Sequence, residues 1–255
     1  GDLPAATSHL DMLFANLALS DKPFIGCSFS EEASMDGIEM VKLVCRGKSR
    51  PMMIANINSL QPLQISREMA GSLIIFAKHR QPVIMFGGGM MGSTVPIRLQ
   101  GLLVMQNAVV LAGLVLSQLV SPGSPVVYGA GGAPMDLRTG VFYLGTPDYW
   151  KSFTVGAQMA RFYNLPCRGG GALTDDYYPG TQAGTESALC LMASVAAGMN
   201  FILHSCGILG SFIAMSYEKW IIDEEVCAAL RSFYEPLEVN EETIDLRAMK
   251  DVGPG

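Results

Sequence analysis

Several side chains that can do chemistry stand at the ends of short apolar runs. His204 follows Phe201–Leu203, and an imidazole there could move a proton near neutral pH or bind a metal. A core histidine with a hydrogen-bond partner is the structural alternative. Other runs end in aromatic, amide, cationic or glycine residues that could contact a ligand. These further candidates for binding are Phe29, Asn56, Gly88, Tyr128, Arg168 and Gly170.

Acidic side chains beside aromatic ones indicate a cationic substrate. Asp175 and Tyr177 follow the triplet Gly169–Gly171, and such a pair would attract a methylated ammonium ion by charge and by cation–π contact. Glu186 lies near the start of an otherwise uncharged helical stretch, where its carboxylate could take a proton or stabilise a cation. The alternatives are a solvated loop for the first pair and a favourable helix-dipole contact for Glu186. Further aromatic walls could come from Tyr143, Tyr149 and Trp150.

The cysteines raise the alternative of a zinc site. Cys27, Cys167 and Cys206 lie within the apolar runs, and with His204 they could converge on one rim and supply the sulfur and nitrogen ligands of tetrahedral zinc. Their spacing is not local, and free cysteines are commonly small buried hydrophobic residues. Six cysteines in 255 residues do not form a dense disulfide framework, so we expect reduced thiols and a cytoplasmic location.

A repeated unit positions these candidates. A short apolar run ends in small or polar residues, and a helical stretch follows. Five of the six runs open with proline, which suits the first residue of a strand because proline has no N–H for a sheet ladder. Alternating strands and helices predict parallel strands, whose carboxyl ends gather the chemistry. The runs are Pro23–Ser30, Pro51–Ser59, Pro82–Gly92, Pro125–Gly132, Pro166–Ala172 and Phe201–Gly207.

Helices are predicted between the runs. Ser30 and Ser66 resemble N-caps because acidic residues follow them, which suits the helix dipole. A short helix is expected near Glu241–Lys250. The longer helices are predicted at Thr7–Ala18, Glu32–Cys45, Ser66–His79, Ile97–Leu119, Thr146–Tyr163, Thr181–Gly198 and Tyr217–Tyr234.

The composition limits the class of protein. Hydrophobic residues make up 49% of the chain and charged residues 16%, as expected for parallel strands buried on both faces. Leu102–Val120 and Ser187–Tyr217 are uncharged and long enough to suggest membrane spans. Gln106 and Asn107 in the first, and Gly198 in the second, favour buried helices, so no membrane is expected. The net charge of −6 and the lack of a basic stripe argue against nucleic acid.

Two α/β architectures fit six strand–helix units. One is an open doubly wound sheet, which should carry a glycine-rich phosphate fingerprint after its first strand. Gly87–Gly92 matches that fingerprint only weakly, and no Walker motif is present. The other is a (β/α)8 barrel of the TIM type. It would be truncated, because six strands are too few to close an eight-stranded barrel. In either case residues 1–255 are predicted to form a single domain, partial in the case of the barrel.

The chain resembles the trimethylamine methyltransferase family, and the resemblance runs through essentially all of it. No single motif is specific, but together they are. The segments that carry it are Thr7–Asp11, Asp21–Gly26, Leu119–Gly129, Gly145–Pro147, Gln182–Ser187, Asn200–His204, Tyr217–Lys219 and Val252–Gly255.

This resemblance implies a (β/α)8 barrel that transfers a methyl group from a methylated amine to the cobalt of a corrinoid (cobalamin) held by a partner protein. His204 would then act near the substrate or corrinoid, with Glu186 beside it, and no metal would be bound. The sequence lacks the DxHxxG motif with which carrier proteins ligate corrinoid, so a partner is expected to supply it. The uncharged helices are also compatible with contacts in a homo-oligomer.

The sequence departs from the family pattern in two ways. Family members are roughly twice as long, so one or two leading barrel units and a following segment are expected to be missing from these 255 residues. The trimethylamine enzymes use pyrrolysine, and none is written in the region Ala172–Pro179. Members without it resemble enzymes for quaternary amines, so a quaternary amine such as a betaine is favoured over trimethylamine. A zinc-dependent thiol or alcohol:corrinoid methyltransferase and an inactive scaffold that docks a corrinoid protein are the alternatives.

Overall fold

The protein is built on a curled parallel sheet. The computed structural model describes residues 3–4, 6–45 and 53–254. All neighbouring strands of the main sheet are parallel, and they follow the order of the chain, β1-β2-β3-β5-β7-β8. Each predicted run therefore contributes one strand, although Pro51 lies outside the described residues. The strands are β1 (Phe24–Ile25), β2 (Met53–Asn58), β3 (Val83–Phe86), β5 (Val126–Gly129), β7 (Cys167–Gly170) and β8 (Phe201–Leu203).

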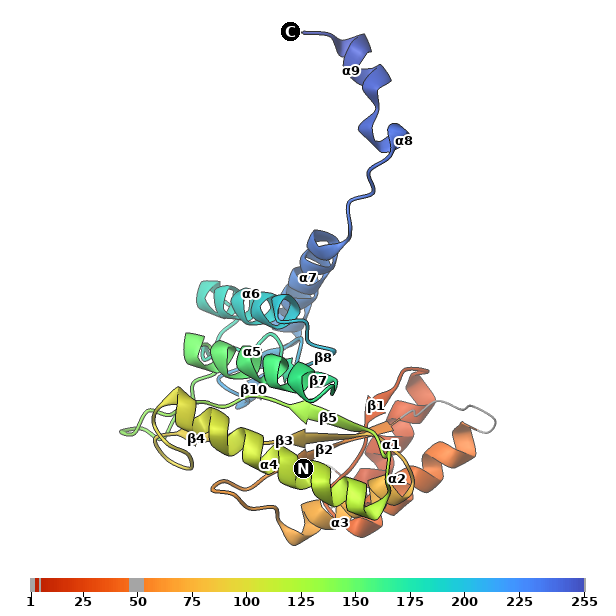
Figure 1. Ribbon diagram of the computed structural model, residues 1–255, viewed down its shortest axis with the longest axis vertical. Helices are drawn as coiled ribbons and strands as arrows, with labels where there is room; N and C mark the ends of the chain where they lie inside the picture. Colours follow the sequence, from red (N-terminus) through yellow and green to blue (C-terminus); the bar gives the residue numbers. More distant parts are fainter. Residues whose placement is uncertain (1–2, 5, 46–52, 255) are drawn as a thin grey trace.

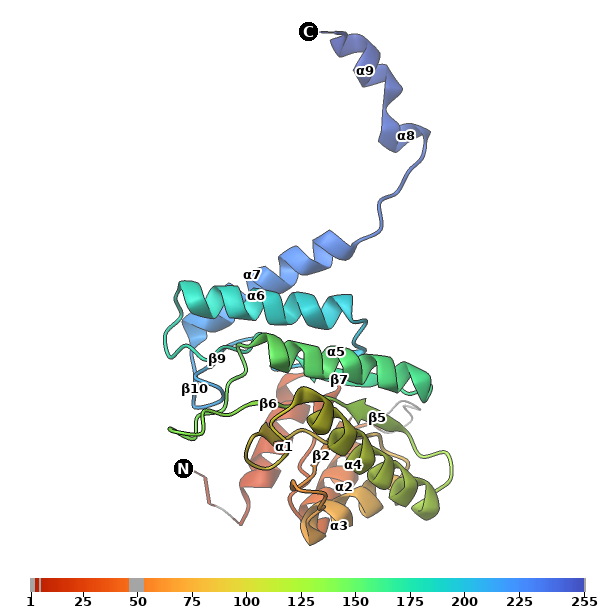
Figure 2. The same cartoon turned by 60° about the vertical axis from the view of Figure 1, so that its left-hand side comes forward.

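This strand order decides between the two predicted architectures. A doubly wound sheet would reverse its strand order at a switch point. Here the order never reverses, and consecutive helices pack against one another around the outside of the sheet (Figures 1 and 2). The described residues form half of a TIM-like barrel rather than a closed one.

The helices agree with the predicted ones to within two residues at nearly every end. The hydroxyl groups of Ser30 and Ser66 accept hydrogen bonds from the N–H groups of Ala33 (3.1 Å) and Met69 (3.2 Å), as expected of N-caps. The helices are α1 (Ser8–Leu19), α2 (Glu31–Val44), α3 (Arg67–Lys78), α4 (Leu99–Val120), α5 (Pro147–Phe162), α6 (Thr181–Ala196), α7 (Tyr217–Tyr234), α8 (Glu241–Ile244) and α9 (Leu246–Val252).

The core lies between the sheet and this layer of helices. Ile57 and Met85 from the strands, and Phe76 and Phe153 from the helices, are completely buried. Burying a side chain of this size contributes about 1.5–3 kcal/mol. The core thus stabilises the frame on which the strand ends are held.

Among the described residues, α4 is the one helix whose length and apolar composition would allow it to cross a membrane. In this structure it packs against β3, β5, α3 and α5. Its polar side chains Gln106 and Ser117 are buried, and the side-chain oxygen of Gln106 accepts a hydrogen bond from the N–H of Gly131 (3.0 Å). One face of α4 therefore packs against the sheet and binds the loops at the carboxyl ends of its strands.

Two small ladders lie beyond the carboxyl ends of the main strands. Strand β4 (Met90–Met91) pairs with β6 (Ala133–Pro134), and β9 (Ile208–Leu209) pairs with β10 (Ala214–Met215). The predicted run Pro82–Gly92 is thus divided after β3. Gly87 lies at this division and lets the backbone pass close to α4, since a Cβ there would lie 2.6 Å from the backbone oxygen of Gln106.

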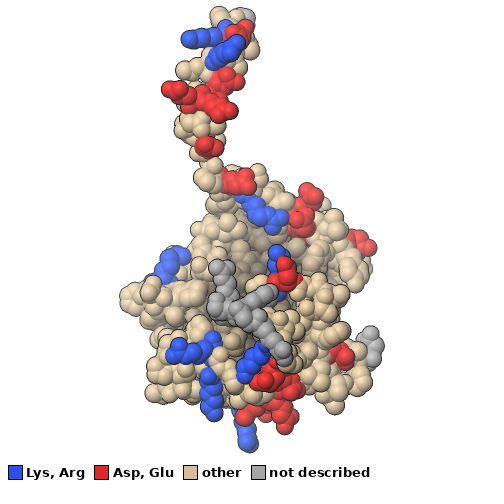
Figure 3. Space-filling model, turned by 90° about the vertical axis from the view of Figure 1, so that its right-hand side faces the viewer, with Lys and Arg blue, Asp and Glu red and all other residues tan. Residues whose placement is uncertain are grey.

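The end of the chain extends away from the barrel. Helices α8 and α9 follow α7 on an extended connection, and all their residues are exposed (Figure 1). The predicted helix Glu241–Lys250 is split at Asp245, whose φ of +48° interrupts helical geometry. Charged side chains are sparse over most of the face shown in Figure 3, whereas the tail carries both signs.

Candidate active site

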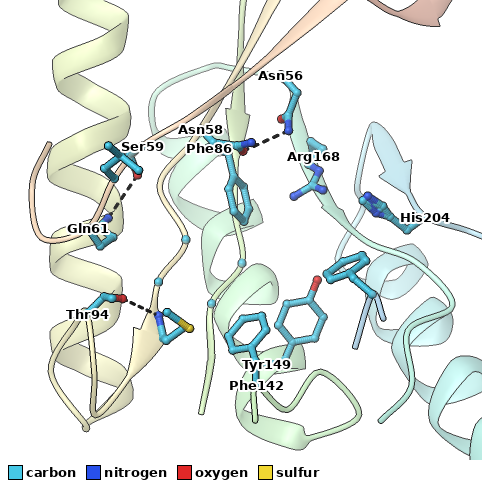
Figure 4. A pocket seen from close by; sticks show the side chains of 17 residues that line it. Asn56, Asn58, Ser59, Gln61, Phe86, Thr94, Phe142, Tyr149, Arg168 and His204 are labelled. Atoms are coloured by element: carbon cyan, nitrogen blue, oxygen red, sulfur yellow. Dashed lines mark hydrogen bonds between the residues drawn. The ribbon is translucent and has the colours of Figure 1, made fainter. Parts of the chain in front are cut away.

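A cavity of about 500 Å³ opens at the carboxyl ends of β2, β3, β5, β7 and β8 (Figure 4). Four of the predicted site residues line it, namely Asn56, Gly88, Arg168 and His204. Parallel strands place their carboxyl ends on one rim, which explains why residues so distant in sequence meet. The other side chains that line it include Asn58, Gln61, Phe86, Phe142, Tyr149 and Phe212.

Arg168 is a buried cation in this cavity. It is 6% exposed, and its guanidinium carbon lies 4.7 Å from the centre of the Phe86 ring. Within the described residues it forms no ion pair, and its Nε atom has no hydrogen-bond partner. Burial lowers the pKa of Arg168, but a guanidinium remains charged at neutral pH. The cavity therefore holds a positive charge that an anionic group could neutralise.

His204 stands beside Arg168 in an unusual backbone conformation. Its φ of +61° lies in the left-handed region, and its ring packs edge-to-face against Phe212 with 4.8 Å between centres. Burial and, secondarily, the Arg168 charge lower the pKa of His204 to about 4. The ring is therefore neutral at pH 7, with one nitrogen able to donate and the other able to accept. Its Nδ1 atom has no partner among the described residues.

Asn56 supplies a third unpaired polar atom. Its amide nitrogen donates to the Oδ1 of Asn58 (3.1 Å), whereas its own Oδ1 is buried without a partner in the described part of the chain. Buried polar atoms are rarely left unsatisfied unless a ligand or water completes them. Asn56, Arg168 and His204 all line one cavity, so a water molecule or a polar ligand there would complete their hydrogen bonds.

Aromatic side chains form the other walls of the cavity. Phe86, Phe142 and Tyr149 contribute ring surface (Figure 4), and Phe212 also lines the cavity. Burial raises the pKa of Tyr149, so its phenol stays neutral. Ring faces attract organic cations. The cavity thus combines the positive charge of Arg168 with aromatic surfaces that suit the cationic group of a ligand.

Gly88 is required by the close approach of two loops in this wall. A Cβ at Gly88 would lie 2.3 Å from the backbone oxygen of Gly131. Any larger residue would push apart the loops that follow β3 and β5. This glycine shapes the cavity through its backbone rather than by a side chain.

Three predicted binding residues lie outside the cavity. Tyr128 is fully buried on the helix side of β5, where its hydroxyl donates to the Oδ1 of Asn107 (3.1 Å) and burial raises its pKa to about 12. Phe29 is 55% exposed in the turn before α2. Gly170 is buried behind the wall, where a Cβ would lie 2.4 Å from the hydroxyl oxygen of Tyr149.

The acidic candidates also lie outside the cavity and join loops around it. The Asp175 carboxylate accepts hydrogen bonds from the N–H groups of Leu144 (2.6 Å) and Gly145 (3.0 Å). Glu186 accepts one from the N–H of Asp175 (2.8 Å). Tyr177 is about half exposed. The structure therefore brings neither Glu186 nor Asp175 into contact with the cavity beside His204.

The residues of the alternative zinc site are not brought together. Cys27 points its thiol toward the backbone oxygen of His9 (4.0 Å), and Cys167 points its thiol toward the Oδ1 of Asn200 (3.5 Å). In the described part of the chain, no three His, Cys, Asp or Glu side chains are arranged to hold a metal ion.

Sequence reasoning missed several residues that line the cavity. Gln61 donates to the backbone oxygen of Gly87 (2.9 Å) from the loop after β2. Phe142 and Phe212 come from the loop after β6 and the turn between β9 and β10. Phe142 and Phe212 do not stand at the end of a main strand, so the strand–helix repeat in the sequence could not identify them. Tyr149, suggested as an aromatic wall, does line the cavity.

Comparisons with known proteins agree on one family. A family model described as trimethylamine methyltransferase (MTTB) matches residues 1–255. A glycine betaine methyltransferase of Desulfitobacterium hafniense (strain Y51) is 40% identical over 258 residues, which cover 100% of this chain and 54% of that protein.

Two further relatives act on other amines, as their names state. An L-carnitine:corrinoid methyltransferase of Eubacterium limosum is 36% identical over 194 residues, covering 76% of this chain and 40% of that protein. Trimethylamine methyltransferase MttB of Methanosarcina thermophila is 32% identical over 208 residues, covering 82% and 43%. The chain spans about half the length of the curated relatives it matches.

Proposed function

The chain belongs to the trimethylamine methyltransferase family, and we propose that this protein transfers a methyl group from a quaternary amine to a corrinoid carried by a partner protein. We further propose that the preferred amine bears a carboxylate, as a betaine does. The cavity at the carboxyl ends of the strands is the proposed active site. The observation that carries this proposal is the buried Arg168 cation, which has no counter-charge among the residues that the structure describes.

The charge of Arg168 favours one class of amine over the others. A carboxylate would pair with the guanidinium of Arg168 through charge-assisted hydrogen bonds, which are the strongest kind. His204 and Asn56 would complete its polar surroundings, since both have unpaired atoms in the same cavity. The ammonium end would lie against the aromatic walls. An amine without an anionic group would meet the Arg168 charge with nothing to offset it.

The proposed reaction requires little acid or base catalysis by the residues of this chain. When the methyl carbon leaves a quaternary nitrogen, the bonding electron pair stays on nitrogen, and the product is a neutral tertiary amine group. No proton has to be donated, which is compatible with a His204 that is neutral at pH 7. The corrinoid supplies a nucleophilic Co(I) that accepts the methyl group. The residues of this chain bind the amine, orient its methyl group and exclude water.

The size of the cavity supports a corrinoid that belongs to the partner. About 500 Å³ suits a small organic zwitterion, whereas a corrin ring is too wide to be enclosed there. The polar and aromatic walls therefore fit the amine, and the corrinoid would meet them at the open side of the cavity.

All six cysteines are free, which supports a reducing, cytoplasmic location.

The test uses the full-length protein with a reduced corrinoid protein. Glycine betaine, L-carnitine and trimethylamine are each added, and consumption of Co(I) is followed by its absorbance. We expect consumption with the carboxylate-bearing amines. If none of the three amines changes the absorbance, the proposed methyltransferase activity is contradicted. The remaining alternative is then an inactive scaffold that docks a corrinoid protein.

Binding of the amine alone tests the role of Arg168. By calorimetry, Arg168→Met should weaken binding of glycine betaine by about 10- to 100-fold, the effect of losing one or more charged hydrogen bonds. Arg168→Lys should restore part of the affinity because it keeps the charge but not the planar fork. Arg161→Met is the matched control, since Arg161 lies at the far end of α5 and bonds to the backbone of Ala197. Equal affinities of the Arg168→Met and Arg161→Met variants would refute the assignment.

A further inference from the structure

The carboxylate of Asp175 joins three loops at the rim of the barrel. Asp175 lies in the loop between β7 and α6, and its oxygens accept three hydrogen bonds from outside that loop. The donors are the N–H of Leu144 (2.6 Å), the N–H of Gly145 (3.0 Å) and the hydroxyl of Ser211 (2.5 Å). Leu144 and Gly145 precede α5, and Ser211 is in the turn between β9 and β10. One side chain therefore connects the last three loops above the cavity.

Each of the two partner loops carries an aromatic wall of the cavity. Phe142 lies two residues before Leu144, and Phe212 directly follows Ser211; both line the cavity. Two backbone hydrogen bonds also join the turn to the Asp175 loop, from the N–H of Ser211 to the oxygen of Thr174 (2.9 Å) and from the N–H of Gly210 to the oxygen of Asp176 (2.8 Å). The loop with Phe142 is held to Asp175 through the carboxylate. Backbone contacts also hold Phe142, which pairs with Met135 while the N–H of Tyr143 donates to the oxygen of Pro134 (2.9 Å). The Asp175 carboxylate is the side chain that joins this loop to the turn with Phe212.

The turn that carries Phe212 is in a conformation that must be held. Ser211 has a φ of +51° and Phe212 a φ of +79°, in a region that residues other than glycine, asparagine and aspartate rarely adopt. Such conformations persist where the surrounding structure over-determines them. The hydrogen bond from Ser211 to Asp175 is one of the contacts that do so. It keeps the Phe212 ring against His204, with 4.8 Å between ring centres.

The carboxylate is suited to this position because it can only accept hydrogen bonds. Among the described residues Asp175 forms no ion pair, and the three groups that its oxygens contact are all donors. An asparagine of the same shape would place an NH₂ group against at least one of these donors. The neighbouring Asp176 differs, since its side chain accepts from the N–H of Tyr178 within the same loop (3.2 Å).

We propose that Asp175 is a positioning residue that holds Phe142 and Phe212 at a set spacing and thereby determines how large an ammonium group the cavity accepts. The proposal rests on the proposed function for its substrate class. It does not rest on that function for the positioning itself, because the hydrogen bonds are present in the protein alone. Asp175 acts through the two aromatic rings and touches no substrate.

Hydrogen exchange of the full-length protein tests the positioning. Asp175→Asn should accelerate amide exchange by about tenfold in peptides covering residues 141–146 and 208–215, because charged hydrogen bonds of this kind are lost. Ser211→Ala should accelerate only the second peptide. Asp176→Asn, the matched control, should leave both at the wild-type rate. Unchanged exchange in the Asp175→Asn variant would overturn the proposal.

Binding of two amines tests the effect on specificity. Calorimetry compares glycine betaine with its bulkier N,N,N-triethyl analogue, in the absence of corrinoid. The wild-type protein should prefer the trimethyl compound, and Asp175→Asn should reduce that preference by about tenfold, with Ser211→Ala changing it less in the same direction. An unchanged preference together with faster exchange would reduce Asp175 to a structural role and refute the specificity claim. If the wild-type protein binds neither compound, the proposed function fails, while hydrogen exchange still decides the positioning.

Discussion

The titration of His204 should make the protein less stable as the pH falls from 7 to 5. The pKa of His204 is about 4 in the folded state because the ring is buried and lies near Arg168, whereas an exposed histidine has a pKa near 6.5. Between these values the unfolded chain binds a proton that the folded protein does not. The free energy of unfolding therefore decreases as the pH falls through this window. The loss from this one group amounts to about 2 kcal/mol at pH 5 and about 3 kcal/mol below pH 4.

The assay isolates this group by comparison with a variant that cannot titrate. His204→Asn is suitable because asparagine tolerates the left-handed backbone at this position, where φ is +61°. Urea unfolding of both proteins at pH 7 and at pH 5 gives the change in unfolding free energy for each. The wild-type protein should lose about 2 kcal/mol more than the variant. His79→Gln controls for the loss of a histidine outside the cavity.

An equal pH dependence of the wild-type and His204→Asn proteins would refute this reasoning. It would mean that the ring accepts a proton as readily in the folded state as in the unfolded one. A second variant separates the two causes of the low pKa. Arg168→Met removes the neighbouring charge, so it should raise the pKa of His204 while leaving most of the effect of burial in place.

Three further changes test the surroundings of the site. Lys219→Met should destabilise the protein by about 3–5 kcal/mol in urea unfolding, because it leaves the buried Asp223 carboxylate without its partner, and the double variant with Asp223→Leu should recover much of the loss. Tyr128→Phe should cost about 1 kcal/mol by removing the hydrogen bond to Asn107, and calorimetry should find amine binding unchanged; a weakened affinity would place Tyr128 in the site after all. Ser66→Ala should cost about 1 kcal/mol, measured by the same unfolding assay, because α3 loses its N-cap.

The part of the site that could be predicted from the sequence comes from the ends of the strands. Asn56, Gly88, Arg168 and His204 follow apolar runs, and the parallel arrangement places those run ends on one rim. The residues that could not be predicted come from loops. Phe212 reaches the cavity because a turn after the last strand folds back over it. No periodic pattern or composition bias marks such a loop.

Strand facing explains why the structure places Tyr128 and Cys167 away from the cavity. Tyr128 pairs with Cys167, and Gly129 pairs with Arg168 on the neighbouring strand. Successive residues of a strand point to opposite faces, so Tyr128 and Cys167 face the helices when Arg168 faces the cavity. Strand β5 reads Val-Val-Tyr-Gly, and this part of the sequence has no alternation of polar and apolar residues that would reveal which of them point inward.

Local chemistry in the sequence determined the elements of this protein and their order. Prolines that open apolar runs, glycines that close them, and serine caps act over a few residues, so the strands and helices could be placed before any contact was known. The tertiary structure alone decided which side chains share the cavity, that Arg168 has no counter-charge among the described residues, and that Asp175 joins three loops rather than meeting a ligand. These properties depend on strand register and on contacts between residues far apart in the chain, which a local pattern does not contain.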